Sequence, residues 1–231
     1  MSLDDWMAQG PAVESDWAGH VTRLAIRGEL GHAGASLLLD LPALAAPYAC
    51  QPNACTPGLR VPRTRSCCAD LDVDLSDSEH AAITADLTAI TAYLAPRDER
   101  WANGSPTWST QSLLARPKKR CVFAVLGVEG ALSCGLHALE DESRRERGAL
   151  KPLTCRLFPL LVVDLEGGQR LLTAVSRGTI KHGVPSPRWF PCLRVAERAS
   201  TVAEETGDTL RELWGERRAR GIQRQVREFG G

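Results

Sequence analysis

Eight cysteines are the residues of this chain whose type and position could do chemistry. They are Cys50, Cys55, Cys67, Cys68, Cys121, Cys134, Cys155 and Cys192. Several stand beside proline, glycine or turn residues, whereas a cysteine that serves only as a small hydrophobe tends to fall on the core face of a helix or strand. Because thiolates on loops can converge on one centre, this placement predicts a cysteine-ligated site for zinc, iron or an iron–sulfur cluster.

The first four cysteines lie between residues 50 and 68, in and beside a stretch that is rich in proline. From Pro42 to Arg65 the prolines and Gly58 interrupt any helical or strand periodicity, which predicts an irregular loop. Cys67 and Cys68 are adjacent, and neighbouring side chains diverge in an extended chain. We therefore expect them to serve different metals, or one to be a ligand and the other a packing residue.

A Cys-x-x-His pair, Cys134 and His137, lies in the second group of cysteines. Two residues between ligands allow both side chains to bind one ion, and thiolate with imidazole suits zinc or iron. His137 is therefore a secondary candidate ligand. The other histidines are isolated and are more simply surface or hydrogen-bonded residues, with His182 the best of them as a spare ligand; they are His20, His32, His80 and His182.

Three other interpretations of the cysteines stay open. A disulfide scaffold is disfavoured because eight cysteines in 231 residues fall well below the roughly 8 to 10% typical of such proteins. Ordinary thiols are the second interpretation, and Cys121 before Val-Phe-Ala-Val suits a core position. A redox pair at Cys67 and Cys68 is the third, although adjacent cysteines seldom bridge and the Cys-x-x-Cys spacing is absent.

The order of these motifs resembles the YkgJ-type cysteine-cluster family, bacterial proteins described as zinc- or iron-chelating domains. The resemblance covers about residues 50 to 160, and its most specific part is Lys151-Pro-Leu-Thr-Cys155-Arg-Leu-Phe-Pro159. The other matching elements are Cys50, Cys55, Cys67-Cys68, Cys121-Val-Phe and Cys134-Gly-Leu-His137. The resemblance implies metal binding through the cysteines and brings no settled activity with it.

Two departures from the family pattern stand in the sequence. The first cysteine pair is spaced by four residues instead of two, and a charged insertion runs from Ala138 to Leu150. A related cysteine motif occurs in flagellin lysine methylases that look to carry an iron–sulfur cluster. That likeness implies an iron–sulfur enzyme as the alternative to a non-catalytic or accessory metal-binding protein.

The number of cysteines does not choose between the metals. Eight thiolates could fill two tetrahedral zinc sites, whereas a four-iron cluster uses four thiolates and leaves the others for a second site or for structure. Cations near such a centre would favour its thiolates. Arg156 fits this role as well as it fits a solvated side chain, and for Lys151 the solvated interpretation is favoured. Sequence signatures of hydrolases, zinc proteases, P-loops and Rossmann folds are absent, so no catalytic residue is predicted.

Composition excludes a strong global field, because 28 Lys and Arg balance 28 Asp and Glu. Nucleic acid is not an expected partner, and the arginines near the C-terminus most simply form a solvated helix face, with a protein-binding role as the alternative.

The most apolar segment, Ser36 to Ala46, is too short for a membrane span. The acidic first residues, Met1 to Trp17, do not resemble a secretory signal, which predicts a cytoplasmic protein with reduced thiols. A metal ion is the one expected partner.

The elements that must position the cysteines predict an α+β fold, with a small antiparallel sheet, two main helices and long cysteine-bearing loops. Ser76 with Glu79 is the pattern of a capping box, and helical spacing follows it until Pro96. Alternation around Val73 predicts a half-buried strand. Further short strands, or strands and buried segments, are predicted at His20–Leu30, Ser36–Leu41 and Cys121–Leu126.

A hairpin and a C-terminal helix complete the expected fold. Strands at Pro159–Leu165 and Arg170–Val175 flank two glycines, which predicts a hairpin turn. Helical spacing runs from about residue 195 to residue 229, weakened at Gly215, with core positions Leu210, Leu213, Trp214, Ile222 and Val226. We expect one domain over residues 1–231, with the metal-binding region at about residues 50–192 and the helical segment after it.

Overall fold

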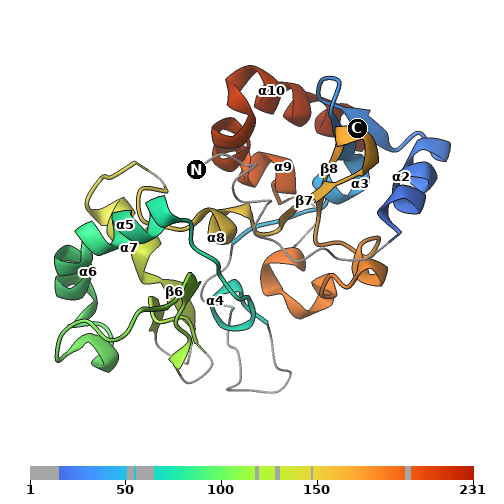
Figure 1. The fold of residues 1–231 in the computed structure, drawn as a ribbon. Helices are drawn as coiled ribbons and strands as arrows, with labels where there is room; N and C mark the ends of the chain where they lie inside the picture. Colours follow the sequence, from blue (N-terminus) through green and yellow to red (C-terminus); the bar gives the residue numbers. More distant parts are fainter. Residues whose placement is uncertain are drawn as a thin grey trace. The chain divides into compact units, whose positions relative to one another are not determined.

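The computed structural model describes residues 16–50, 55, 65–117, 120–127, 131–146, 148–195 and 199–231. In these residues the chain combines helices with one four-stranded and two two-stranded sheets (Figure 1). The predicted combination of helices with small sheets is thereby confirmed. That two helices dominate the fold stays a prediction. No helix in the described ranges combines the length and the apolar character that crossing a membrane requires.

The chain divides into two compact units, and each is described by itself. Of the described residues, the first unit comprises 55, 65–117, 120–127, 131–146 and 148–156, and the second comprises 16–50, 157–195 and 199–231. Most of the proline-rich loop that we predicted falls on residues 51–54 and 56–64, outside the described residues. A single domain over residues 1–231 stays a prediction.

The first unit consists of short helices and two small hairpins. Its elements are α4 (Cys67–Asp70), α5 (Asp77–Ala85), α6 (Leu87–Leu94), η2 (Glu99–Trp101), β3 (Ser109–Thr110), β4 (Leu113–Leu114), β5 (Ala124–Leu126), β6 (Leu132–Cys134), α7 (Gly135–Glu142) and α8 (Leu153–Leu157), the last of which ends in the second unit. β3 pairs with β4 and β5 pairs with β6, both antiparallel. The strand predicted at Cys121–Leu126 is thus shorter and begins at Ala124.

The capping box at Ser76 is confirmed. The Ser76 hydroxyl accepts from the N–H of Glu79, and the Glu79 carboxylate accepts from the N–H of Ser76 at 2.9 Å. The helix that follows is broken at Asp86 into α5 and α6. The helical spacing between Ser76 and Pro96 predicts Ile83, Leu87, Ile90 and Leu94 as one face; Ile83, Ile90 and Leu94 are buried, whereas Leu87 is half-buried.

Aromatic side chains form the centre of the first unit's core. Trp101 lies 5.5 Å from Phe123 and Trp108 lies 5.9 Å from it, between ring centroids. Three cysteines are packed against this core, partly buried: Cys121, Cys134 and Cys155. The predicted strand around Val73 is an extended segment with one isolated bridge, from Asp74 to Leu113. Its alternating burial is as predicted.

The second unit is built on a four-stranded sheet. Its elements are α2 (Trp17–Ile26), β1 (Leu30–His32), β2 (Leu37–Asp40), α3 (Leu41–Leu44), β7 (Leu160–Asp164), η5 (Glu166–Gly168), β8 (Arg170–Ala174), η6 (Ile180–His182), η7 (Pro187–Trp189), η8 (Pro191–Leu193), α9 (Val202–Glu205) and α10 (Gly207–Gly230). The strand order is β1-β2-β8-β7. The two hairpins are antiparallel, but β2 and β8 run parallel where the hairpins meet, so the sheet is mixed and the prediction of a purely antiparallel one is wrong.

The segment His20–Leu30, predicted to be a strand or buried segment, is largely helix α2. The Asp16 side chain begins the helix by accepting from the N–H of Gly19 at 2.7 Å. Trp17, His20 and Leu24 are its buried residues, and their spacing of three and four is helical. The strand at Ser36–Leu41 and the hairpin around Gly167 and Gly168 are confirmed as β2 and β7–β8.

The predicted C-terminal helix is present as α9 and α10. Gly215, at φ 77° and ψ 160°, interrupts α10 where the sequence indicated weakness. Leu210, Ile222 and Val226 are buried as predicted, whereas Leu213 and Trp214 are half-buried.

The edge strand β1 is closed by a side chain of α10. The Gln225 amide accepts from the N–H of His32 at 3.1 Å and donates to its C=O at 2.8 Å. It therefore occupies the two backbone groups as a neighbouring strand would.

We expect Gln225→Ala to lower the free energy of unfolding by about 1 kcal/mol, because two hydrogen bonds at the sheet edge are lost. Chemical denaturation measures this. Arg224→Ala, an exposed neighbour on the same helix, is the control, and its effect should stay below about 0.5 kcal/mol. Equal effects of the two substitutions would contradict a role for the Gln225 amide.

Candidate metal centre

Three segments that are far apart in sequence bring cysteines together in the first unit. The N–H of Cys121 donates to the C=O of Cys68 at 2.7 Å, which joins the start of the β5 segment to α4. The β5–β6 pairing then sets Cys134 opposite Ala124. Cys55 also belongs here, since its C=O accepts from the N–H of Leu132 at 3.0 Å. β6 therefore has Cys55 on one side and the segment that begins at Cys121 on the other.

The thiols of this group act on one another electrostatically. Burial, followed by the charge of Cys134, raises the pKa of Cys121 to about 12. Burial and then the charges of Cys134, Cys121 and Cys67 hold the pKa of Cys155 well above its usual range. Burial also raises the pKa of Cys134, with Cys67 adding to the effect. A thiolate at Cys67 therefore opposes ionisation of Cys121, Cys134 and Cys155, so these thiols lie close enough to interact electrostatically.

Cys67 and Cys68 form the closest pair, with 3.9 Å between the two Sγ atoms. The hydrogen bond from Cys68 lowers the pKa of Cys67 to about 6 against the effect of burial, and the charge of Lys151 assists. The same bond raises the pKa of Cys68. Our expectation that the pair diverges assumed an extended chain, but the pair begins helix α4 and its two thiols lie together.

Lys151 is a cation that acts on several of the thiols. Its charge lowers the pKa of Cys67, and it acts in the same direction on Cys134 and Cys155, where burial is the larger effect. Lys151 is half-buried, so this charge effect adds to the predicted solvated side chain a role near the thiols. Arg156 has a structural contact instead, because its Nε donates to the C=O of Lys151 at 3.0 Å.

Glu140 ties α7 to the segment that carries Lys151. Its carboxylate is 1% exposed and accepts from the N–H groups of Gly148, Leu150 and Lys151 at 3.2, 2.6 and 2.7 Å. Burial alone would raise the pKa of Glu140, but the bonds it accepts outweigh burial and lower the pKa. Sequence reasoning missed this residue, whose one signal was an acidic side chain next to Leu139 on the apolar face of a helix.

A second buried carboxylate holds the Cys121 segment. Asp98 pairs with Arg100 at 2.7 Å and with Arg120 at 2.9 Å. Arg100 in turn donates to the C=O of Cys121 at 3.2 Å and to the C=O of Ala124 at 2.5 Å. The turn that presents Cys121 is thus fixed by a side-chain network that the sequence pattern did not reveal.

His137 lies one turn along the helix that begins after Cys134. Its Nδ1 is buried and has no hydrogen-bond partner among the described residues, with the Glu140 carboxylate 3.9 Å away. A buried nitrogen without a hydrogen bond, next to a group of thiols, fits a ligand position for zinc or iron. His20 and His80 are hydrogen-bonded to Asp40 and Ser109, as predicted for satisfied histidines.

Cys50 and Cys192 belong to the second unit. Cys50 is exposed and Cys192 is buried, and the N–H of Ala49 donates to the C=O of Cys192 at 3.1 Å. The two cysteines therefore lie on adjoining segments of that unit. Their place among the metal ligands stays a prediction.

The donor set suits a metal, but the side chains are not arranged as a formed coordination sphere. All eight cysteines are outside disulfides. In the part of the chain that the structure describes, no three His, Cys, Asp or Glu side chains are placed as a metal-holding group. No protein-family model, curated protein or solved structure matches the chain. The case for a metal therefore depends on the chemistry of the thiols.

Asp98→Asn tests the network of ion pairs and hydrogen bonds that holds the backbone at Cys121. Burial would raise the pKa of Asp98, but Arg100 and Arg120 lower it below its ordinary value of 3.8. The carboxylate therefore stabilises the fold above about pH 3.8, and this contribution is lost as pH falls through the lower folded-state value.

We expect Asp98→Asn to cost about 2 kcal/mol at neutral pH, and the cost to shrink as the unsubstituted protein is acidified below that range. Denaturation at a series of pH values measures both effects. Asp72→Asn, which alters an exposed ion pair with Arg116, should cost less than about 1 kcal/mol. A cost for Asp98→Asn that does not change with pH would count against the ion pairs.

Glu140→Gln should expose the segment before Cys155. An amide offers one acceptor oxygen, and its NH₂ group would face an N–H donor, so we expect a loss of about 2 kcal/mol. Hydrogen exchange at Leu150 and Lys151 should accelerate. Glu142→Gln, at an exposed position of the same helix, is the matched control. Unchanged exchange in Glu140→Gln would show that the carboxylate does not hold this segment.

Proposed function

We propose that the first unit holds a zinc or iron centre through cysteine thiolates, and that the chain is a metal-binding protein with a non-catalytic or accessory role. The observation that carries the proposal is the grouping of buried thiols, in which the pKa of Cys67 is lowered to about 6 and the pKa values of Cys121, Cys134 and Cys155 are raised by burial and by neighbouring thiols. Neighbouring thiols that oppose one another's ionisation are stable as thiolates only if a cation lies among them. A metal ion displaces the thiol protons and converts the repulsion into attraction.

The ligand set follows from the same effects. The thiols linked by these effects are Cys67, Cys68, Cys121, Cys134 and Cys155, enough for the four ligands of a tetrahedral zinc ion or of a four-iron cluster and one more. His137 is the next candidate, because it follows Cys134 by one helical turn. The remaining candidates are Cys55, Cys50 and Cys192.

Charge and environment support the proposal. A centre with four thiolates carries excess negative charge, and Lys151 supplies a positive charge that acts on three of these thiols. The order of the cysteines, which resembles that of the YkgJ-type family, also supports chelation. Such thiols must stay reduced, so the proposal places the chain in the cytoplasm or another reducing compartment.

Substitution of single thiols tests the ligand set. We expect Cys134→Ser and Cys155→Ser each to lower the metal content of protein purified without oxygen, as measured by elemental analysis. Ser133→Ala, a neighbouring substitution on β6, should keep the full content. Unchanged metal stoichiometry in both cysteine variants would remove these residues from the site.

The identity of the metal is measured on the same preparations. Stoichiometric zinc in a colourless protein would support a closed structural or chelating site. Iron with inorganic sulfide and broad visible absorbance would support a cluster, and would justify a search for a reaction. Protein with folded structure but no metal, after reconstitution with either metal, would contradict the proposal.

A further inference from the structure

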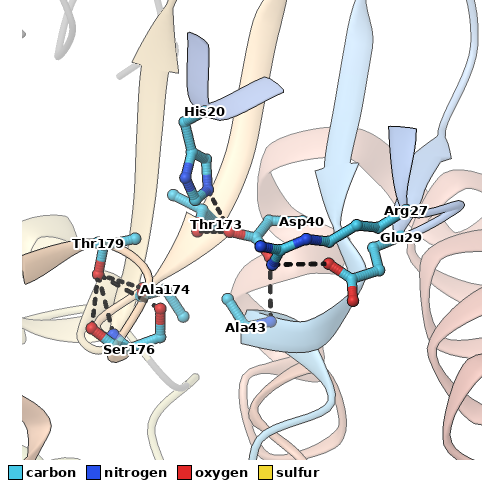
Figure 2. A network of polar contacts seen from close by, with 9 residues as sticks. All are labelled: His20, Arg27, Glu29, Asp40, Ala43, Thr173, Ala174, Ser176 and Thr179. Carbon is cyan, nitrogen blue, oxygen red and sulfur yellow. Dashed lines mark hydrogen bonds and ion pairs between the residues drawn. The ribbon is translucent and has the colours of Figure 1, made fainter. Parts of the chain in front are cut away.

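A buried polar cluster joins α2 to the sheet of the second unit. His20 of α2 lies with its Nε2 2.9 Å from Oδ2 of Asp40, at the end of β2, and Thr173 of β8 donates to the same oxygen at 2.7 Å. The other carboxylate oxygen accepts from the N–H of Ala43 at 3.1 Å (Figure 2). His20, Asp40 and Thr173 are all buried. This carboxylate therefore has three partners.

A second histidine closes the cluster from η6. The ring of His182 stacks on Trp17, with 4.1 Å between centroids and 20° between planes. It also meets His20 edge to face, with 5.2 Å between centroids. All three rings are buried. We name Trp17, His20 and His182 the aromatic latch, because they connect α2 to η6.

We propose that the aromatic latch is an acid-sensitive attachment, and that protonation of His182 releases α2 from the sheet of the second unit. An imidazolium at this position would be buried and would face His20 across the ring contact. The positive charges of Arg23, on α2, and Lys181, on η6, also act on it. The face of Trp17 attracts a cation, but this one favourable contact competes with burial and with three basic neighbours.

Acidic groups offset little of this positive charge. Asp16, at the start of α2, raises the pKa of His182, but burial and the basic neighbours outweigh it. Asp40 already accepts from His20, Thr173 and Ala43. The cluster therefore favours a neutral His182 in the folded state.

The attachment of α2 depends on pH through the pKa of His182. Burial first, and then His20, Lys181 and Arg23, lower the pKa of His182 below its ordinary value of 6.5. The attachment is therefore fully present above about pH 6.5 and weakens as pH falls below it, because the released state binds the extra proton. With one proton linked, the opening constant rises by at most about tenfold per pH unit.

Hydrogen exchange along the full chain tests the latch between about pH 7.5 and pH 5, the range in which histidine titrates. After correction for intrinsic rates, we expect α2 amides to lose protection as pH falls, while the buried Leu171 and Leu172 of β8 keep theirs. His182→Phe keeps a stacking ring but cannot be protonated, so it should abolish the pH dependence. Three outcomes would each overturn the proposal. The amides of α2 could keep constant protection, α2 and β8 could lose protection equally, or His182→Phe could show the same pH dependence.

Asp16→Asn gives a second test if His182→Phe fails to fold. Asparagine caps a helix about as well as aspartate, so α2 should form, but an anion that raises the pKa of His182 is gone. The folded state then binds the proton still more weakly, so α2 should lose more protection at the acid end of the range than in the unsubstituted protein. An unchanged or smaller acid-induced loss would contradict the proposed role of His182.

Discussion

Burial of closely placed thiols is the constraint around which the first unit is built. Burial, with neighbouring thiols adding to it, raises the pKa values of Cys121, Cys134 and Cys155, so these thiols resist ionisation unless a cation accompanies them. The folded core next to the thiols strengthens this effect, because burial removes the solvent that would stabilise a thiolate. The aromatic core of this unit therefore holds the segments in place and also keeps these thiols neutral in the absence of a cation.

Buried carboxylates hold the irregular segments that present these thiols. Glu140 accepts from three backbone N–H groups between Gly148 and Lys151, and Asp98 holds two arginines, one of which binds the backbone around Cys121. Such segments lack the hydrogen bonds of a helix or sheet, so their N–H and C=O groups need other partners. One carboxylate with several donors supplies them, and charged bonds of this kind are stronger than neutral ones.

Local patterns in the sequence predicted individual turns, caps and hairpins well. They predicted the contacts that bring the cysteine segments together less well. The capping box at Ser76, the hairpin at Gly167 and the break at Gly215 each depend on a few neighbouring residues, and all three are present. The helix at Trp17 was missed although its buried residues, Trp17, His20 and Leu24, recur at helical spacing, because one of them is a histidine and does not read as an apolar position. Glu140 could not have been found by pattern, since its donors lie eight to eleven residues away along an irregular chain. Metal chemistry at the cysteines was inferred from residue type and stays a prediction.

The two units contain buried titratable groups whose neighbours have opposite charge, and acid affects both. The thiol group of the first unit has an excess of potential negative charge, which only a cation can offset. The latch of the second has an excess of positive neighbours around His182, which excludes a further proton. Protons oppose both arrangements: they compete with metal for the thiolates, and they add a charge that the latch cannot accommodate. Acid should therefore oppose the proposed metal binding and weaken the proposed attachment of α2 alike, although the groups that titrate are different residues in different units.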